Sequence, residues 1–325
     1  CALPILRSLA LRLGQTGKVR WPAWITLAGG LPAHPQADSL RHGLNPLFDI
    51  LHEDDDLLVV NKPAGLVCHP TKGDAYSSLI SRVRLHLGPE SKPHLVNRLD
   101  RETSGVTVVA KTALAAGQLG RIWESRAVAK EYLAIVHGHV RAEIGMVDAP
   151  LGKDERSRVA IKDCVRPDGS PSQTEFFVER RFWRLAGATA LEATASAAAD
   201  NHGGTRLGDP FTLLRVVPHT GRKHQIRIHL AHLGHPIVGD KIYGGDEDCY
   251  LALVENRLTE WQRTRLLLPH QALHAAMVRF VWQGSNMTFR ARPEPWFEAF
   301  ADGHPATADR VIGLADHPLF SAGKG

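Results

Sequence analysis

The chain has 325 residues, a formal net charge of +5 at pH 7, and 43% hydrophobic and 22% charged residues. These values are typical of a globular protein with a large core. No stretch reaches the ~18–20 uninterrupted apolar residues of a membrane span, and the N-terminus lacks the ordered regions of a signal peptide. The composition therefore indicates a soluble protein without a membrane partner, and the mild positive charge permits a polyanionic partner without demanding one.

Cysteine usage indicates the compartment. The four cysteines are far apart and form no Cys-x-x-Cys pair: Cys1, Cys68, Cys164 and Cys249. This spacing suggests neither a zinc cage nor a disulfide scaffold. Reduced thiols and a cytoplasmic location fit best.

Regular structure is first predicted after an acidic turn. Leu57 to Val60 has the apolar, β-branched character of a strand, which the sequence from Asn61 to Gly65 should end. Leu66 to Cys68 can resume a strand. Apolar residues at helical spacing then predict a helix from Ser78 to Leu87.

The next segment places one carboxylate among guanidinium groups. His94 to Leu99 can form a short strand, with Leu99 on one face and Arg98 and Asp100 on the other. Thr103 to Gly105 has turn chemistry, and Val106 to Ala110 is apolar enough for a buried strand. Asp100 should therefore lie in a corner between two core strands, fixed but reachable.

The neighbours of Asp100 suggest a chemical role. Nearby Arg98 and Arg101 favour the charged form of this carboxyl group. A fixed carboxylate of this kind can act as a nucleophile or a base. The alternative is an ordinary turn aspartate in a surface ion pair.

A helix from Leu114 to Ser125 and a strand from Glu131 to Val136 are predicted next. In that strand, Tyr132 and Ala134 share one face. The other face, with Leu133 and Ile135, is apolar.

Three further expectations concern the middle of the chain. Arg156 to Ile161 and Gln173 to Phe182 could pair as a hairpin across the turn from Arg166 to Ser170. Residues 187–208 have no apolar period and predict a loop insertion. Phe211 to Val217 should return to strand.

A basic helix is predicted after that strand. No acidic residue lies between Asp209 and Asp240. Helical spacing of apolar residues predicts one helix, with Thr220 as its cap and Gly234 at its end. Arg222 and Lys223 would then lie in the first turn, where a phosphate could bind. Solvated basic residues on an exposed turn are the alternative.

The histidines of this segment raise the question of a metal site. They are His224, His229, His232 and His235. Helix positions five apart point about 140° away from each other, the surrounding cations would repel a divalent ion, and no carboxylate or thiolate is near in sequence. Histidines that are hydrogen-bonded or face a phosphate are favoured over metal ligands.

Five motifs, in this order over about residues 48–297, resemble those of the RluA-type pseudouridine synthases. They are Lys62 to Gly65; Asn97 to Gly105; Lys130 to Ala134; Thr220 to His229 with Gly234 to Asp240; and Leu273 to Ala275. A single match would be weak, but five in family order are specific. The family usually has histidine where Asn97 stands, and asparagine still offers a donor and an acceptor.

The resemblance implies an α+β fold with a mixed, mainly antiparallel central sheet flanked by helices and loops. It implies an isomerase that converts specific uridines in structured RNA, rRNA or tRNA, to pseudouridine without a cofactor. By motif correspondence Asp100 is the catalytic aspartate and attacks either the base or the sugar of a flipped-out uridine. Tyr132 stacks on the flipped-out base and could assist proton removal, and Arg227 pairs with Asp100. The expected substrate-binding residues are Arg98, Arg101, Arg222, Lys223, His224, Lys130, Lys62 and His69.

The resemblance also implies a domain organisation. Residues 46–300 would form the catalytic domain, interrupted by the 187–208 insertion and followed by a tail over 301–325. Residues 1–45 would be an N-terminal extension, either a truncated RNA-binding element or none. A monomer is expected.

Two other classes of function remain open from the sequence. One is an RNA-binding protein that keeps the basic helix but has lost catalysis, although such a protein has no need to keep Asp100, Tyr132 and Arg227 together. The other is a metal-dependent hydrolase that uses the histidines.

Overall fold

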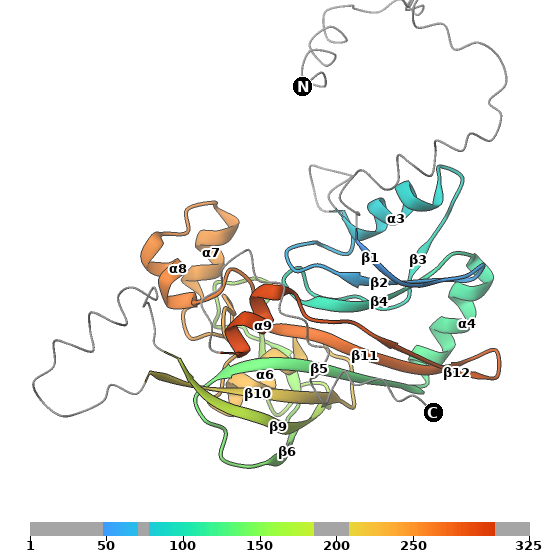
Figure 1. Cartoon of the computed structure of the whole chain (residues 1–325). Helices are drawn as coiled ribbons and strands as arrows, with labels where there is room; N and C mark the ends of the chain where they lie inside the picture. Colours follow the sequence, from blue (N-terminus) through green and yellow to red (C-terminus); the bar gives the residue numbers. More distant parts are fainter. Residues whose placement is uncertain (1–47, 71–77, 185–207, 303–325) are drawn as a thin grey trace, which may run out of the picture. The chain divides into compact units, whose positions relative to one another are not determined.

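The computed structural model describes residues 48–70, 78–184 and 208–302 (Figure 1). The expected N-terminal extension lies outside these ranges, as do nearly all of the expected loop insertion and C-terminal tail. No helix within the described ranges is long and apolar enough to cross a membrane.

One large sheet organises the described residues. Its path is β1-β2-β4-β11-β5-β10-β9-β6, with β12 paired to β11 and β3 paired to β4, while β7 and β8 form a separate pair. The strands are β1 (Asp49–Glu53), β2 (Leu57–Lys62), β3 (His94–Leu95), β4 (Ser104–Ala110), β5 (Val128–His137), β6 (Ile144–Asp148), β7 (Leu151–Lys153), β8 (Asp163–Val165), β9 (Gln173–Arg184), β10 (Asp209–Pro218), β11 (Leu273–Trp282) and β12 (Ser285–Arg290). The helices are α3 (Leu79–Leu87), α4 (Ala113–Glu124), α6 (Gln225–His232), α7 (Asp248–Val254), α8 (Glu260–Leu266) and α9 (Pro295–Ala301).

The sheet is mixed and mainly antiparallel, which confirms the expected fold class. Among the paired strands of the described ranges, only β4 and β11 run parallel. Their contact is short, and within it Ala275 of β11 lies opposite Gly105 of β4 and also opposite Tyr132 of β5. The corner that carries Asp100 is thereby brought beside the strand that carries Tyr132.

The approach of β4 to β11 requires a glycine. Gly105 has φ +115°, and a Cβ built there would lie 2.3 Å from the carbonyl oxygen of Ala275. No side chain fits at that distance, and L-residues rarely adopt that φ. Gly105 therefore permits the junction between the two halves of the sheet. One half consists of β1, β2 and β4, and the other runs from β11 through β5, β10 and β9 to β6.

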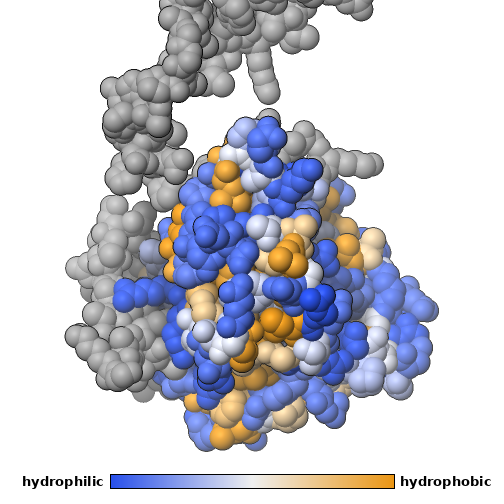
Figure 2. Space-filling view, turned by 90° about the vertical axis from the view of Figure 1, so that its right-hand side faces the viewer, coloured by the Kyte–Doolittle hydropathy of each residue, from blue (hydrophilic) through white to orange (hydrophobic). Residues whose placement is uncertain are grey.

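The core lies on both halves of the sheet. β5, β9, β10 and β11 contribute to the largest apolar cluster, together with α6 and α9. A second cluster joins β2, β4, β11 and β12 to α4, and a third packs α3 against β2 and β4. Figure 2 shows one side of the molecule, where hydrophilic side chains predominate and hydrophobic ones form small separate groups.

Two predicted helices and three predicted strands are confirmed. Ser78 caps α3 and Thr112 caps α4, each side chain accepting a backbone N–H three residues on. β4, β5 and β10 cover the strands predicted near these positions. β2 begins at Leu57 as predicted, but it runs to Lys62 rather than ending at Val60.

The predicted strand from His94 to Leu99 is wrong beyond β3. The Asn97 side chain takes the place of backbone pairing, because its Oδ1 accepts from the Val108 N–H at 2.7 Å and its Nδ2 donates to Val106. The Leu99 N–H donates to the Cys68 sulfur at 3.4 Å instead of to a strand. The turn also begins earlier than predicted, since the Thr103 N–H donates to the Asp100 carbonyl.

Two other predictions are wrong. The hairpin between Arg156 to Ile161 and Gln173 to Phe182 does not form, because β9 pairs with β6 and β10, and 156–161 contains turns. Leu66 to Cys68 does not resume a strand and makes only an isolated bridge from Val67. Strand-like composition identified β9 but could not identify its distant partners.

Candidate active site

A pocket that opens to solvent lies where the two halves of the sheet meet. Its lining comes from the turn before β4, from β5, from the loop before α6, from α6 itself and from the start of β11. The lining residues are Arg98, Leu99, Asp100, Thr103, Lys130, Tyr132, Pro218, Thr220, Gly221, Arg222, His224, Gln225, Ile226, Arg227 and Leu273. Seven sequence-predicted site residues are thus brought together.

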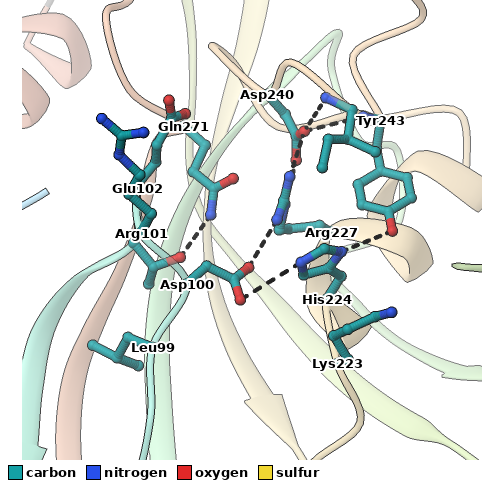
Figure 3. Close-up of polar contacts among 12 residues, drawn as sticks. Leu99, Asp100, Arg101, Glu102, Lys223, His224, Arg227, Asp240, Tyr243 and Gln271 are labelled. Carbon is teal, nitrogen blue, oxygen red and sulfur yellow. Dashed lines mark hydrogen bonds and ion pairs between the residues drawn. The ribbon is translucent and has the colours of Figure 1, made fainter. Parts of the chain in front are cut away.

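The guanidinium of Arg227 joins two carboxylates at this pocket (Figure 3). Its Nε and Nη2 donate to Asp240 at 2.7 and 2.9 Å, and its Nη1 donates to Asp100 Oδ2 at 2.8 Å. Arg227 and Asp240 are buried, whereas the Asp100 side chain is 31% exposed. The exposed member of the cluster is therefore the carboxylate that faces the pocket.

Burial and the neighbouring charges have opposite effects on the pKa values of the inner ion pair, Arg227 and Asp240. Burial opposes the charge of Arg227, but Asp240 and Asp100 outweigh it and raise the pKa of the guanidinium. Burial also opposes the charge of Asp240, but Arg227 and the N–H groups of Tyr243 and Ile242 outweigh it and lower the pKa of that carboxyl. Both groups stay charged because each supplies the partner the other needs.

The basic helix starts later than predicted. α6 begins at Gln225, so Thr220 is not its cap and Arg222 and Lys223 precede it. Instead Gln225 holds the loop: its Oε1 accepts from Thr220 Oγ1 and from the Arg222 N–H, and its Nε2 donates to Thr174 Oγ1 at 2.9 Å. Thr220 is polar and lies before an apolar period, but its hydroxyl donates to the Gln225 side chain rather than capping the helix.

The predicted substrate-binding residues divide into two groups. Arg98, Lys130, Arg222 and His224 line the pocket, whereas Lys62, His69, Arg101 and Lys223 do not. Lys223 forms an ion pair with Asp163 at 2.9 Å, and the Nε of Arg101 donates to the Gly65 carbonyl. His69 is exposed.

Lys62, which the motifs predict to bind substrate, is buried and does not line the pocket. Its ammonium is fully buried and donates to the carbonyls of Pro63, Leu66 and Arg101 at 2.9 to 3.2 Å. Burial lowers the pKa of Lys62 to about 8. Lys62 therefore links the turn after Asp100 to the loop after β2, and all three N–H donors of its ammonium are used within the protein.

Tyr132 of β5 lines the pocket. Burial, and to a smaller extent the charge of Asp100, raise the pKa of its hydroxyl to about 12. The phenol is therefore protonated at neutral pH and can donate a hydrogen bond but cannot act there as a phenolate base.

Two buried histidines are saturated by protein groups. His229 contacts Thr174 Oγ1 at 2.8 Å and the Ala149 carbonyl at 3.0 Å. His274 contacts Ser104 Oγ at 2.8 Å and the Ala291 carbonyl at 3.0 Å. Within the described ranges no group of three histidine, cysteine, aspartate or glutamate side chains could hold a metal ion.

Sequence reasoning missed Asp240, Tyr243 and Gln225 as parts of the site. Asp240 carries a usable signal, because it is the first acidic residue after a long basic interval that contains a helical arginine. A buried arginine requires a carboxylate. Tyr243 and Gln225 carry no such signal, since their partners lie in distant β8 and β9.

Comparison with known proteins now places the chain in a family. Residues 56–232 match the family model described as RNA pseudouridylate synthase. A ribosomal large subunit pseudouridine synthase D of Vibrio cholerae serotype O1 is 35% identical over 236 residues, which cover 72% of this chain and 63% of the relative. An uncharacterized RNA pseudouridine synthase of Aquifex aeolicus is 35% identical over 203 residues, which cover 61% of this chain and 56% of the relative.

The solved structures agree with the sequence relatives. Human RNA pseudouridylate synthase domain containing 1 has a TM-score of 0.57 and 25% identity, with 77% of this chain and 85% of that chain covered. The chain belongs to the RNA pseudouridylate synthase family, among its RluA-type members. Over the matched residues it spans about three fifths of the length of the two curated relatives named above.

The inner ion pair generates a prediction for stability. Asp240→Asn should lower the free energy of unfolding by about 3 kcal/mol at pH 7, because it leaves a buried guanidinium short of its charged partner. The folded pKa of Asp240 is lowered, so its stabilisation is complete above the ordinary aspartate pKa of ~3.9 and is lost as pH falls through the folded value.

Urea unfolding at a series of pH values measures this. The gap between wild type and Asp240→Asn should be constant from pH 8 to pH 5 and shrink below about pH 4. Asp168→Asn, which removes an exposed ion pair with Arg166, is the control and should change stability little. A gap that grows on acidification would contradict the assignment.

Proposed function

We propose that this protein converts uridine in RNA to pseudouridine, with Asp100 as the nucleophile that acts on a flipped-out nucleotide. The observation that carries the proposal is the Asp100 carboxylate, held by Arg227 at 2.8 Å and open to the pocket. Membership of the family supports the reaction class. Ribosomal RNA is the substrate class supported by the names of the relatives.

The reaction needs no oxidant or reductant. The bond from the sugar C1′ to N1 of the uracil breaks, the base turns, a bond from C1′ to C5 forms, C5 loses a proton and N1 gains one, so that product and substrate have the same atoms. A carboxylate that attacks the flipped nucleotide can hold one fragment while the base turns. Arg227 holds the Oδ2 atom of the carboxylate in place during these steps, because its fork is also bound to Asp240.

The pocket suits a uracil that has left its helix. A base inside an RNA stem cannot be reached, so it must be unstacked and placed against an aromatic face. Tyr132 lines the pocket together with Asp100 and offers that face. Its protonated hydroxyl suits a donor to the base rather than a proton acceptor.

Basic residues at the pocket would hold the RNA backbone. Arg98 and Arg222 are exposed and line it, and Lys130 lies two residues from Tyr132 on the same face of β5. Burial lowers the pKa of Lys130, and no acceptor in the described part of the chain lies within hydrogen-bond distance of its ammonium. An RNA phosphate or a uracil carbonyl would complete its contacts.

Substitution of Asp100 tests the proposed function. Asp100→Asn keeps the size of the side chain but removes the negative charge, so it should abolish pseudouridine formation while RNA binding changes by no more than a few fold. Chromatography of the nucleosides from ribosomal RNA, incubated with each purified protein after isolation from cells that lack the gene, separates pseudouridine from uridine and measures the product. Isomerisation by pure Asp100→Asn would falsify the role of Asp100, and an inactive wild type would count against the proposed function.

The two cations before α6 should contribute unequally to RNA binding. Arg222 lines the pocket, whereas Lys223 is already paired with Asp163. Arg222→Ala should therefore reduce the slope of log affinity against log salt by about 0.7 to 0.9, the value of one phosphate contact. Lys223→Ala should reduce it less. Filter binding between 50 and 200 mM salt measures the two slopes. Equal reductions of the slope in the two variants would contradict the unequal roles of Arg222 and Lys223.

A further inference from the structure

His224 is held in an unusual conformation between the pocket and the turn after Asp240. It is the last residue before α6 and has φ 55°, which is in the left-handed region that a β-carbon disfavours. Its side chain is only 8% exposed. A strained, buried histidine beside Asp100 indicates that the position of this imidazole matters.

The two ring nitrogens of His224 have different partners (Figure 3). Nδ1 lies 3.0 Å from the Tyr243 hydroxyl oxygen, which also accepts the backbone N–H of Asp163 at 3.2 Å. Nε2 lies 3.8 Å from Asp100 Oδ1. Arg227 binds the other oxygen, Oδ2, so each oxygen of Asp100 has a separate neighbour.

These contacts define the tautomer. Burial raises the pKa of Tyr243, so its hydroxyl keeps its proton. That proton needs an acceptor, and His224 Nδ1, at 3.0 Å from the hydroxyl oxygen, is placed to accept it while the oxygen accepts the Asp163 N–H. Nδ1 therefore accepts, and the proton of the neutral imidazole is on Nε2, directed at Asp100.

Burial and the neighbouring cations keep the imidazole of His224 neutral, against the effect of two carboxylates. Arg227 and Lys223 face it from α6 and the preceding loop, while Asp100 and Asp240 face it from their turns. Burial, reinforced by Arg227, lowers the pKa of His224 to about 4. A neutral N–H can orient Asp100 without forming a second ion pair that would weaken the carboxylate as a nucleophile.

We propose that His224 is a positioning residue for Asp100, and that Tyr243 fixes the tautomer in which Nε2–H faces Asp100 Oδ1. Arg227 alone holds one oxygen and leaves the plane of the carboxylate free to turn, whereas a second donor defines that plane. The distance of 3.8 Å is longer than a hydrogen bond. The contact closes when substrate enters, as catalytic hydrogen bonds do in many unliganded sites. The inference rests on the proposed function of Asp100.

Nuclear magnetic resonance of the full chain labelled with ¹⁵N-histidine tests the tautomer without substrate. The His224 signals, assigned by their loss in His224→Gln, should show a protonated Nε2 and a bare Nδ1 from pH 7 down to about pH 5.5. Tyr243→Phe should give mixed tautomers, and Tyr250→Phe should match wild type. A protonated Nδ1 in the wild type, or an imidazolium at pH 7, would overturn the proposal.

Single-turnover kinetics on RNA test the effect on Asp100. His224→Leu should slow pseudouridine formation by about tenfold or more, the loss expected from one donor, with the RNA dissociation constant within about twofold. His224→Gln, which keeps an N–H donor, should recover part of the rate. His232→Gln, exposed on the same helix, is the control and should match wild type.

The outcomes separate the two proposals. A His224→Leu protein at the wild-type rate, or equal losses in the Leu and Gln variants, would overturn the positioning role. Tyr243→Phe covers the case in which His224→Leu does not fold, because it keeps the ring and should also slow the rate. A wild type without activity would contradict the proposed function, while the resonance experiment would still decide the tautomer.

Discussion

The arrangement of the site depends on one guanidinium shared by two carboxylates. Arg227 is 5% exposed, and an arginine so buried is stable only with charged partners. Asp240 neutralises it from the buried side through two of its nitrogens. Asp100 is therefore not needed to neutralise Arg227. The three groups together have a net negative charge, and the exposed carboxylate among them is Asp100, at the pocket.

The fold brings these groups together through backbone contacts between segments that are distant in the sequence. Ala275 of β11 lies opposite both Gly105 and Tyr132, so the corner after Asp100 and the face of β5 meet at one point. α6 is fixed against β9 by the hydrogen bonds that Gln225 and His229 make with the Thr174 hydroxyl. A shift of α6 would move Arg227 away from Asp100, and for that reason the helix has polar anchors at its buried face.

Much of the fold could be predicted from the sequence. Helical and alternating patterns predicted α3, α4 and β5, and the apolar run from Val106 to Ala110 predicted the buried part of β4. Those features depend on residues close together in the chain. The false hairpin before β9 arose because a strand pattern does not identify its partner strand.

The site could be predicted in part. The motifs identified the residues that face the pocket, since Asp100, Tyr132 and Arg227 all line it. They could not reveal that Lys62 is turned inward, because burial of a lysine depends on carbonyls from distant loops. The start of α6 was missed for a similar reason: Thr220 contacts the Gln225 side chain, a contact that only the folded loop defines.

The central claim is that the fork of Arg227, shared with Asp240, holds Asp100 for uridine isomerisation. The most direct measurement is the single-turnover rate of pseudouridine formation for Arg227→Lys beside its matched control Arg222→Lys. A lysine keeps the charge but cannot bind both carboxylates in a fork, so Arg227→Lys should lose at least about 100-fold in rate. Arg222→Lys should stay within a few fold of wild type. Similar rates for the two variants would contradict the account.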